Sequence, residues 1–179
     1  MNKQNFLRYG AAVAFIVIAA FSRLLPHPAN FTAVGALALF GGVYLDKKFA
    51  FLIPLLAMLV SDYVIGFYGG MYWVYGSFVL IGFVGLWLKN HKKPAVILGA
   101  TLTSSVLFFV ITNFGVWMTP GSIYAPSWAG LVDCYISAIP FFRNTIAGDV
   151  VFVSVMFGAY ELLLSTLKKM ESASQLSVG

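Results

Sequence analysis

The sequence predicts an all-α integral membrane protein: a single bundle of six transmembrane helices with both termini on the cytoplasmic side. Composition is the first indication, because 60% of the 179 residues are hydrophobic and only 9% are charged, whereas a soluble domain carries about 25% charged residues. The second is a series of six apolar stretches, and the third is the uneven placement of lysine and arginine along the chain.

Short polar segments separate the six apolar stretches. The stretches cover residues 6–22, 31–45, 49–67, 72–88, 95–118 and 145–167. A span needs about 20 apolar residues, so the second stretch is either tilted or placed deep among the other helices. Pro54 should kink the third, because proline lacks the N–H that a helix needs. Residues 1–170 then form one transmembrane domain, and residues 171–179 form a disordered polar tail.

Lysine and arginine orient the predicted bundle. When the chain is threaded back and forth, nine of its eleven basic residues fall in one compartment, and only Arg23 and Arg143 fall in the other. Short loops rich in lysine and arginine stay in the cytoplasm, so the loops after the first, third and fifth spans should lie outside. The basic pairs at span ends suit anionic lipid headgroups of the bilayer, and no nucleic-acid partner is predicted.

The longest loop, between the fifth and sixth spans, contains a predicted amphipathic helix at residues 128–139. Ser127 can cap its first turn, and apolar residues recur there at i, i+3 and i+4. We expect this helix to lie across the outer face and to end at Pro140.

Four ionisable residues stand near the outer ends of the predicted spans. Asp62 and Asp149 lie inside spans three and six, and Arg23 and Arg143 lie at comparable depth. Ionisable groups within spans usually face a cavity or a partner. The four residues could form two ion pairs that hold the helices together, one or more of them could contact a polar ligand, or they could do both.

The string Pro-His-Pro-Ala-Asn at residues 26–30 is the most unusual of the chain. Its two prolines favour an extended conformation that holds His27 and Asn30 at the mouth of the bundle. A metal site that joins His27 to Asp133 and Cys134 is geometrically possible. Zinc needs three or four ligands, however, so a hydrogen-bonding or capping role is favoured, and no metal or cofactor is predicted.

Aromatic residues crowd the predicted outer loops, whereas the inner interface has few. They are Phe67, Tyr68, Tyr72, Trp73, Tyr75, Trp117, Tyr124, Trp128, Tyr135, Phe141 and Phe142. An interfacial belt alone should populate both sides. The asymmetry favours a pocket for a flat, partly apolar ligand, in which Asn113 and Asn144 would add hydrogen bonds.

Catalytic motifs are missing from the sequence, which contains no Gly-x-Ser-x-Gly, no His-Glu-x-x-His and no phosphate-binding loop. An enzyme is therefore not predicted, although a membrane enzyme using Asp149 or Cys134 remains an alternative. A second alternative is a structural or assembly subunit that binds other membrane helices through its small-residue faces.

Four strings carry a resemblance to known proteins. SRLLPHPANFT at residues 22–32, SD at 61–62, TNFGVW at 112–117 and PFFRNT at 140–145 resemble those of an uncharacterised family of small bacterial six-span membrane proteins. The resemblance covers nearly the whole chain and implies a multi-pass protein of the bacterial inner membrane.

The predicted architecture also resembles the substrate-binding (S) components of energy-coupling-factor vitamin transporters. Those proteins bind a micronutrient near the outer face, under the loops that follow spans 1, 3 and 5. The resemblance implies a small-molecule ligand and, as partner, a transmembrane coupling protein with ATPase subunits. S components often carry an Ala-x-x-x-Ala pattern in span 1 for docking, where this chain has Gly10 and Ala14 four residues apart.

The resulting hypothesis is an uptake protein for a vitamin-like micronutrient. The ligand would lie between spans 1, 3, 5 and 6. Arg23 and Arg143 would pair with its anionic or polar group, and Trp73, Trp117 and Tyr135 would stack on its ring.

Overall fold

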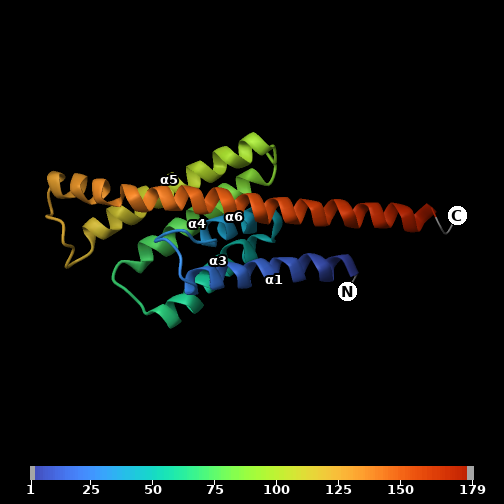
Figure 1. Cartoon of the computed structure of the whole chain (residues 1–179), viewed down its shortest axis with the longest axis horizontal. Helices are drawn as coiled ribbons and strands as arrows, with labels where there is room; N and C mark the ends of the chain where they lie inside the picture. The colour runs from blue at the N-terminus through green and yellow to red at the C-terminus, as the bar shows by residue number, and fades with distance from the viewer. Residues whose placement is uncertain (1–2, 177–179) are drawn as a thin grey trace.

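The computed structural model describes residues 3–176, and this part of the chain forms six α-helices and no strand. They are α1 (Lys3–Leu24), α2 (Val34–Tyr44), α3 (Lys47–Ile65), α4 (Met71–Leu88), α5 (Pro94–Met118) and α6 (Trp128–Leu176). Each predicted apolar stretch overlaps one of these helices. The first turn of α1 and the last turns of α6 point toward the same end of the bundle (Figure 1).

Four helices in the described part of the chain are long and apolar enough to cross a membrane. They are α3, α4, α5 and the portion of α6 from Trp128 to Met170. Large apolar side chains such as Leu56, Val106 and Val155 project from these helices and are roughly half exposed. Apolar surface on this scale is costly in water, so the composition and the helices together indicate a membrane protein.

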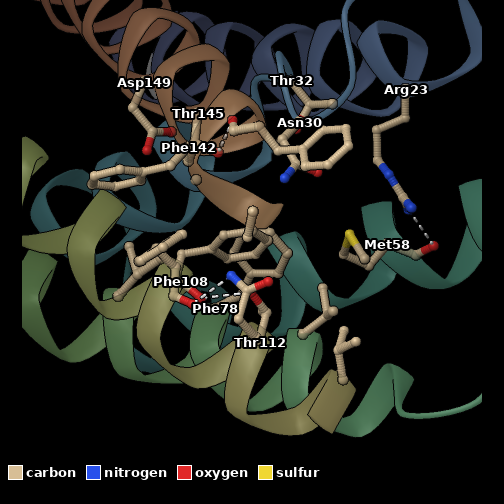
Figure 2. Close-up of a pocket in the computed structure, with 18 of the residues that line it drawn as sticks. Arg23, Asn30, Thr32, Met58, Phe78, Phe108, Thr112, Phe142, Thr145 and Asp149 are labelled. Carbon is tan, nitrogen blue, oxygen red and sulfur yellow. Dashed lines mark hydrogen bonds between the residues drawn. The ribbon is translucent and has the colours of Figure 1, made fainter. Parts of the chain in front are cut away.

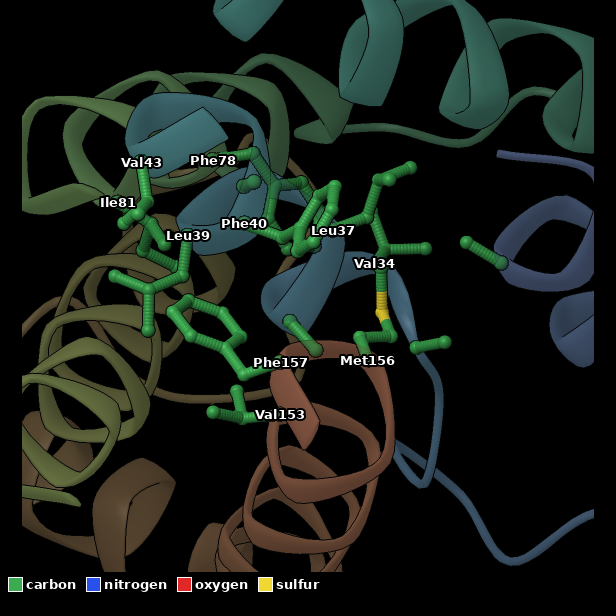
Figure 3. Close-up of a cluster of buried hydrophobic side chains, with 14 of the residues drawn as sticks. Val34, Leu37, Leu39, Phe40, Val43, Phe78, Ile81, Val153, Met156 and Phe157 are labelled. Carbon is green, nitrogen blue, oxygen red and sulfur yellow. The ribbon is translucent and has the colours of Figure 1, made fainter. Parts of the chain in front are cut away.

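Helix α2 is the short helix at the centre of the bundle. Its 11 residues correspond to a length of roughly 16 Å, about half the thickness of a bilayer's hydrocarbon core. Every residue from Val34 to Val43 is buried, and α2 contacts all five other helices. Figure 3 shows its apolar side chains packed between α4 and α6. Of the two alternatives for the second stretch, deep placement among the other helices is therefore the one observed.

Glycines let α2 and α4 approach closely. A Cβ atom on Gly85 would lie 2.4 Å from the Leu39 carbonyl oxygen, and one on Gly42 would lie 2.5 Å from the Gly82 carbonyl oxygen. Both contacts are to backbone, which cannot move aside as a flexible side chain would. Small residues at helix crossings thus serve the close backbone packing that membrane helices favour.

Helix α6 differs from the prediction, which ended a separate loop helix at Pro140. Residues 128–139 are instead the first turns of α6, and Pro140 lies inside it. Proline removes a single helix hydrogen bond, and a long helix packed against a neighbour tolerates that loss. The predicted cap is confirmed, since the Gly130 amide donates to Ser127 Oγ at 3.2 Å.

The C-terminal part of α6 also extends further than the sixth apolar stretch. The helix runs to Leu176 and so includes residues 171–176, which the sequence analysis assigned to a disordered tail. Residues 177–179 of that tail lie outside the described part of the chain.

A polar cluster joins three segments at the end of the bundle that carries Lys47, Lys92 and the α4–α5 loop. The Tyr44 hydroxyl donates to Glu161 Oε1 at 2.5 Å, and Lys92 Nζ lies 3.9 Å from the same oxygen. Lys92 also lies 5.1 Å from the centroid of the Tyr44 ring. Glu161 therefore links α2, α6 and the loop before α5.

Replacement of Gly85 by alanine should destabilise the bundle. The added methyl group would collide with the α2 backbone, and overpacking of this kind costs about 1–3 kcal/mol. Gly76→Ala is the matched control. Gly76 also lies on α4, and a Cβ atom added there would have no neighbouring atom within 4 Å. Thermal unfolding of both variants in detergent measures the difference. Equal midpoints would contradict the packing described for α2 and α4.

Candidate ligand-binding site

A cavity of about 540 Å³ lies where α2 begins, toward the end of the bundle that carries Arg23 (Figure 2). All six helices and two loops contribute to its wall. It is lined by Arg23, His27, Asn30, Thr32, Gly35, Met58, Ile65, Tyr68, Val74, Phe78, Ile81, Phe108, Phe109, Thr112, Asn113, Val116, Ala138, Phe141, Phe142, Thr145 and Asp149. Five of the predicted site residues are among them: Arg23, His27, Asn30, Asn113 and Asp149.

The loop between α1 and α2 brings His27 and Asn30 to the cavity. A turn closes where the Phe31 amide donates to the Pro28 carbonyl at 2.9 Å. Asn30 has a φ of 65°, a left-handed conformation that asparagine tolerates better than most residues. Asn144 Nδ2 donates to the Ala29 carbonyl at 3.0 Å. Asn144 therefore positions this loop rather than lining the cavity itself.

Arg23 and Asp62 form one of the two predicted ion pairs. Arg23 Nη2 lies 2.7 Å from Asp62 Oδ1, and the Asp62 side chain is fully buried. Arg23 Nη1 also donates to Ser61 Oγ and to the Met58 carbonyl. Tyr75 donates to Asp62 Oδ2 at 2.8 Å. Asp62 therefore joins α1, α3 and α4 behind the cavity wall, although it does not line the cavity.

The other two residues of the predicted set, Arg143 and Asp149, do not form an ion pair with each other. The two residues are six positions apart on α6, which places them roughly 120° apart around the helix axis. Arg143 is exposed and makes no ion pair with any described residue. Asp149 is only 6% exposed and accepts a hydrogen bond from Ser105 Oγ at 2.6 Å. Arg143 therefore lies outside the cavity, whereas Asp149 lines it.

The three aromatic residues expected to stack on a ligand lie outside the cavity. Trp73 packs edge-to-face on Phe114, at 5.6 Å between ring centroids. Trp117 donates its indole N–H to the Ala125 carbonyl at 2.9 Å. Tyr135 donates its hydroxyl to the Val110 carbonyl at 2.7 Å. Each therefore serves contacts within the α4–α5–α6 region instead of facing the ligand space.

Phenylalanines form the aromatic wall instead. Phe78 and Phe108 have ring centroids 5.3 Å apart, and Phe109 and Phe142 have centroids 4.5 Å apart. Sequence reasoning singled out Phe142 but missed the other three. A phenylalanine inside an apolar span carries no signal that separates a cavity wall from a lipid-facing surface.

The remaining candidates are the Cys134 thiol and the metal site that would join it to His27 and Asp133. Cys134 is buried outside the cavity, and its thiol donates to the Asn113 carbonyl at 3.4 Å. No group of three His, Cys, Asp or Glu side chains that could hold a metal ion occurs among the described residues. At the cavity rim, partial burial raises the pKa of the Tyr68 phenol, and the negative charge of Asp62 raises it further, whereas Arg23 opposes the shift.

Replacement of Arg23 by glutamine should destabilise the protein strongly. The change strands the buried Asp62 carboxylate, and breaking a buried ion pair from one side costs about 3–5 kcal/mol. Arg143→Gln is the matched control, since Arg143 is exposed and should give a change within about 0.5 kcal/mol. Chemical unfolding in detergent compares the two variants. A similar small effect from both would show that the Arg23–Asp62 pair does not hold α1 on α3.

Comparison with known proteins places the chain in a family. No curated protein and no solved structure shows significant similarity to it. The model of a family of unknown function, DUF6580, matches residues 3–173, nearly the whole chain. The protein is therefore a member of the DUF6580 family.

Proposed function

We propose that this protein is a multi-pass protein of the bacterial cytoplasmic membrane that binds a small, partly aromatic molecule for uptake. The observation that carries the proposal is the cavity at the start of α2, which combines aromatic walls with a few polar side chains. Small-molecule sites are typically concave, mostly apolar and about 300–1,000 Å³ in volume. A cavity of about 540 Å³ suits a ligand of the size of a vitamin.

The rim of the cavity supports access from the Arg23 end. His27, Asn30 and Tyr68 line the cavity and are exposed, and all three belong to loops between helices. In the topology favoured by the basic residues, these loops face outward. A ligand would then enter from outside between the α1–α2 and α3–α4 loops and rest against the phenylalanine wall.

Release on the cytoplasmic side needs an energy source. By its resemblance to S components of energy-coupling-factor transporters, the protein would work with a transmembrane coupling protein and its ATPase subunits. Gly10 and Ala14, which stand where S components often carry two alanines, are exposed on α1. A small, exposed face of this kind suits close approach of a partner helix.

The Ala138→Phe substitution should prevent the ligand from binding in the cavity. Ala138 is buried and lines the cavity, so the new ring would occupy ligand space. Ala147→Phe is the control, because Ala147 is exposed and lies nine positions further along α6, on the opposite face. Mass spectrometry of small molecules released by denaturing each purified protein should find a stoichiometric compound in the wild type and Ala147→Phe, but not in Ala138→Phe.

Two results would count against the proposal. A compound retained equally by both variants would place its site elsewhere on the protein. An empty wild-type protein that co-purifies with membrane subunits in fixed stoichiometry would favour a structural or assembly subunit.

A further inference from the structure

Three of the polar side chains that line the cavity donate a hydrogen to a carbonyl of their own helix. Thr112 Oγ1 donates to the Phe108 carbonyl at 2.7 Å, and Thr145 Oγ1 donates to the Phe141 carbonyl at 3.1 Å. A hydroxyl has one hydrogen and two lone pairs. Thr112 and Thr145 can therefore offer a ligand only acceptor sites.

Asn113 and His27 also present acceptor atoms to the cavity. Asn113 Nδ2 donates one of its two hydrogens to the Phe109 carbonyl at 2.8 Å, and its side-chain oxygen, an acceptor, has no hydrogen-bond partner among the described residues. His27 Nδ1 lies 2.6 Å from the Leu25 carbonyl. Because a carbonyl only accepts, Nδ1 carries the hydrogen, and Nε2 of the neutral ring is left as an acceptor.

Asp149 adds a carboxylate to this set of acceptors. It is 6% exposed, and of the described residues that line the cavity it is the one acidic side chain. Ser105 satisfies Oδ2, but Oδ1 forms no hydrogen bond or ion pair with a described residue. Asp149 Oδ1 lies against Gly35 in the first turn of α2. A Cβ atom on Gly35 would be 2.5 Å from this oxygen. The positive end of the α2 dipole stabilises a charge there only in part.

Arg23 does not balance this charge. Its guanidinium is paired with Asp62 and bonded to Ser61, so the pair is neutral overall. Figure 2 also shows Arg23 on the opposite side of the cavity from Asp149 and Thr145. A carboxylate buried without a counter-charge is costly, and a positively charged ligand group would remove that cost.

We infer that the ligand carries a protonated nitrogen that binds Asp149, and that its ring lies against the phenylalanine wall. This inference rests on the proposed function and reverses the anionic group expected from Arg23 and Arg143. The N–H groups of such a nitrogen match the acceptor sites of Thr112, Thr145 and Asn113. Phenylalanine faces also attract cations, so Phe109 and Phe142 favour the same ligand charge.

Three indole probes test the inference by isothermal titration calorimetry on the full-length protein in detergent. Tryptamine is cationic, tryptophol is its neutral analogue with a hydroxyl in place of the ammonium, and indole-3-acetate is anionic. The wild type should bind tryptamine more tightly than either of the others. Asp149→Asn should weaken tryptamine binding by about thirtyfold or more and leave tryptophol binding little changed.

Asp133→Asn is the matched control, because it removes an exposed carboxylate from the same helix and should leave tryptamine affinity unchanged. Should Asp149→Asn fail to fold, the preference of the wild type among the three probes still decides. Tryptophol or indole-3-acetate binding as tightly as tryptamine, and blocked by Ala138→Phe, would overturn the inference about charge but leave the proposed function standing. No binding of any probe, with no co-purified molecule, would overturn both.

Discussion

The length of α2 is the constraint on which the rest of the structure depends. A helix of 11 residues cannot cross a bilayer, yet α2 is buried on every side. It therefore fills one half of the bundle interior, and the other half must be filled by loops or left open. The glycines at which α2 and α4 pack closely fix the depth of α2. The turn around Asn30 covers part of the space beyond the first residue of α2. The cavity is a direct result of where α2 begins.

The same geometry explains why two buried aspartates behave differently. Asp62 lies on α3, within reach of Arg23 and Tyr75, so its charge is compensated inside the protein. Asp149 lies on α6, next to the first turn of α2, and accepts a hydrogen bond from Ser105. In a low-dielectric interior an unpaired carboxylate is costly. The position of Asp149 therefore suits a side chain that pairs with a ligand. Asp62 therefore joins helices of the bundle, and we infer that Asp149 selects the charge of the ligand.

Sequence reasoning predicted the helices well because apolar length is a strong signal, and most helix ends fall within a few residues of the predicted ones. It failed at Pro140, since helix contacts outside the local sequence decide whether a helix continues through a proline. Of the polar residues singled out in apolar surroundings, Arg23, Asn113 and Asp149 line the cavity, whereas Asp62 and Arg143 do not. Of the aromatic residues singled out, Tyr68, Phe141 and Phe142 line the cavity, whereas Trp117 and Tyr135 bond to backbone carbonyls outside it. The true wall, including Phe78 and Phe108, is indistinguishable in sequence from lipid-facing phenylalanine.

Accessibility of single cysteines to water-soluble reagents tests the central claim, a cavity that begins at α2 and opens at the Arg23 end. In a Cys134→Ser background, Thr112→Cys would place a thiol in the cavity wall, and Val106→Cys would place one on the exposed apolar face of the same helix. A small, charged, membrane-impermeant thiol reagent applied to intact cells should modify position 112 and leave position 106 unmodified. If both thiols stay unreactive while the protein is folded, the cavity does not open to the outside at the Arg23 end, which contradicts the claim.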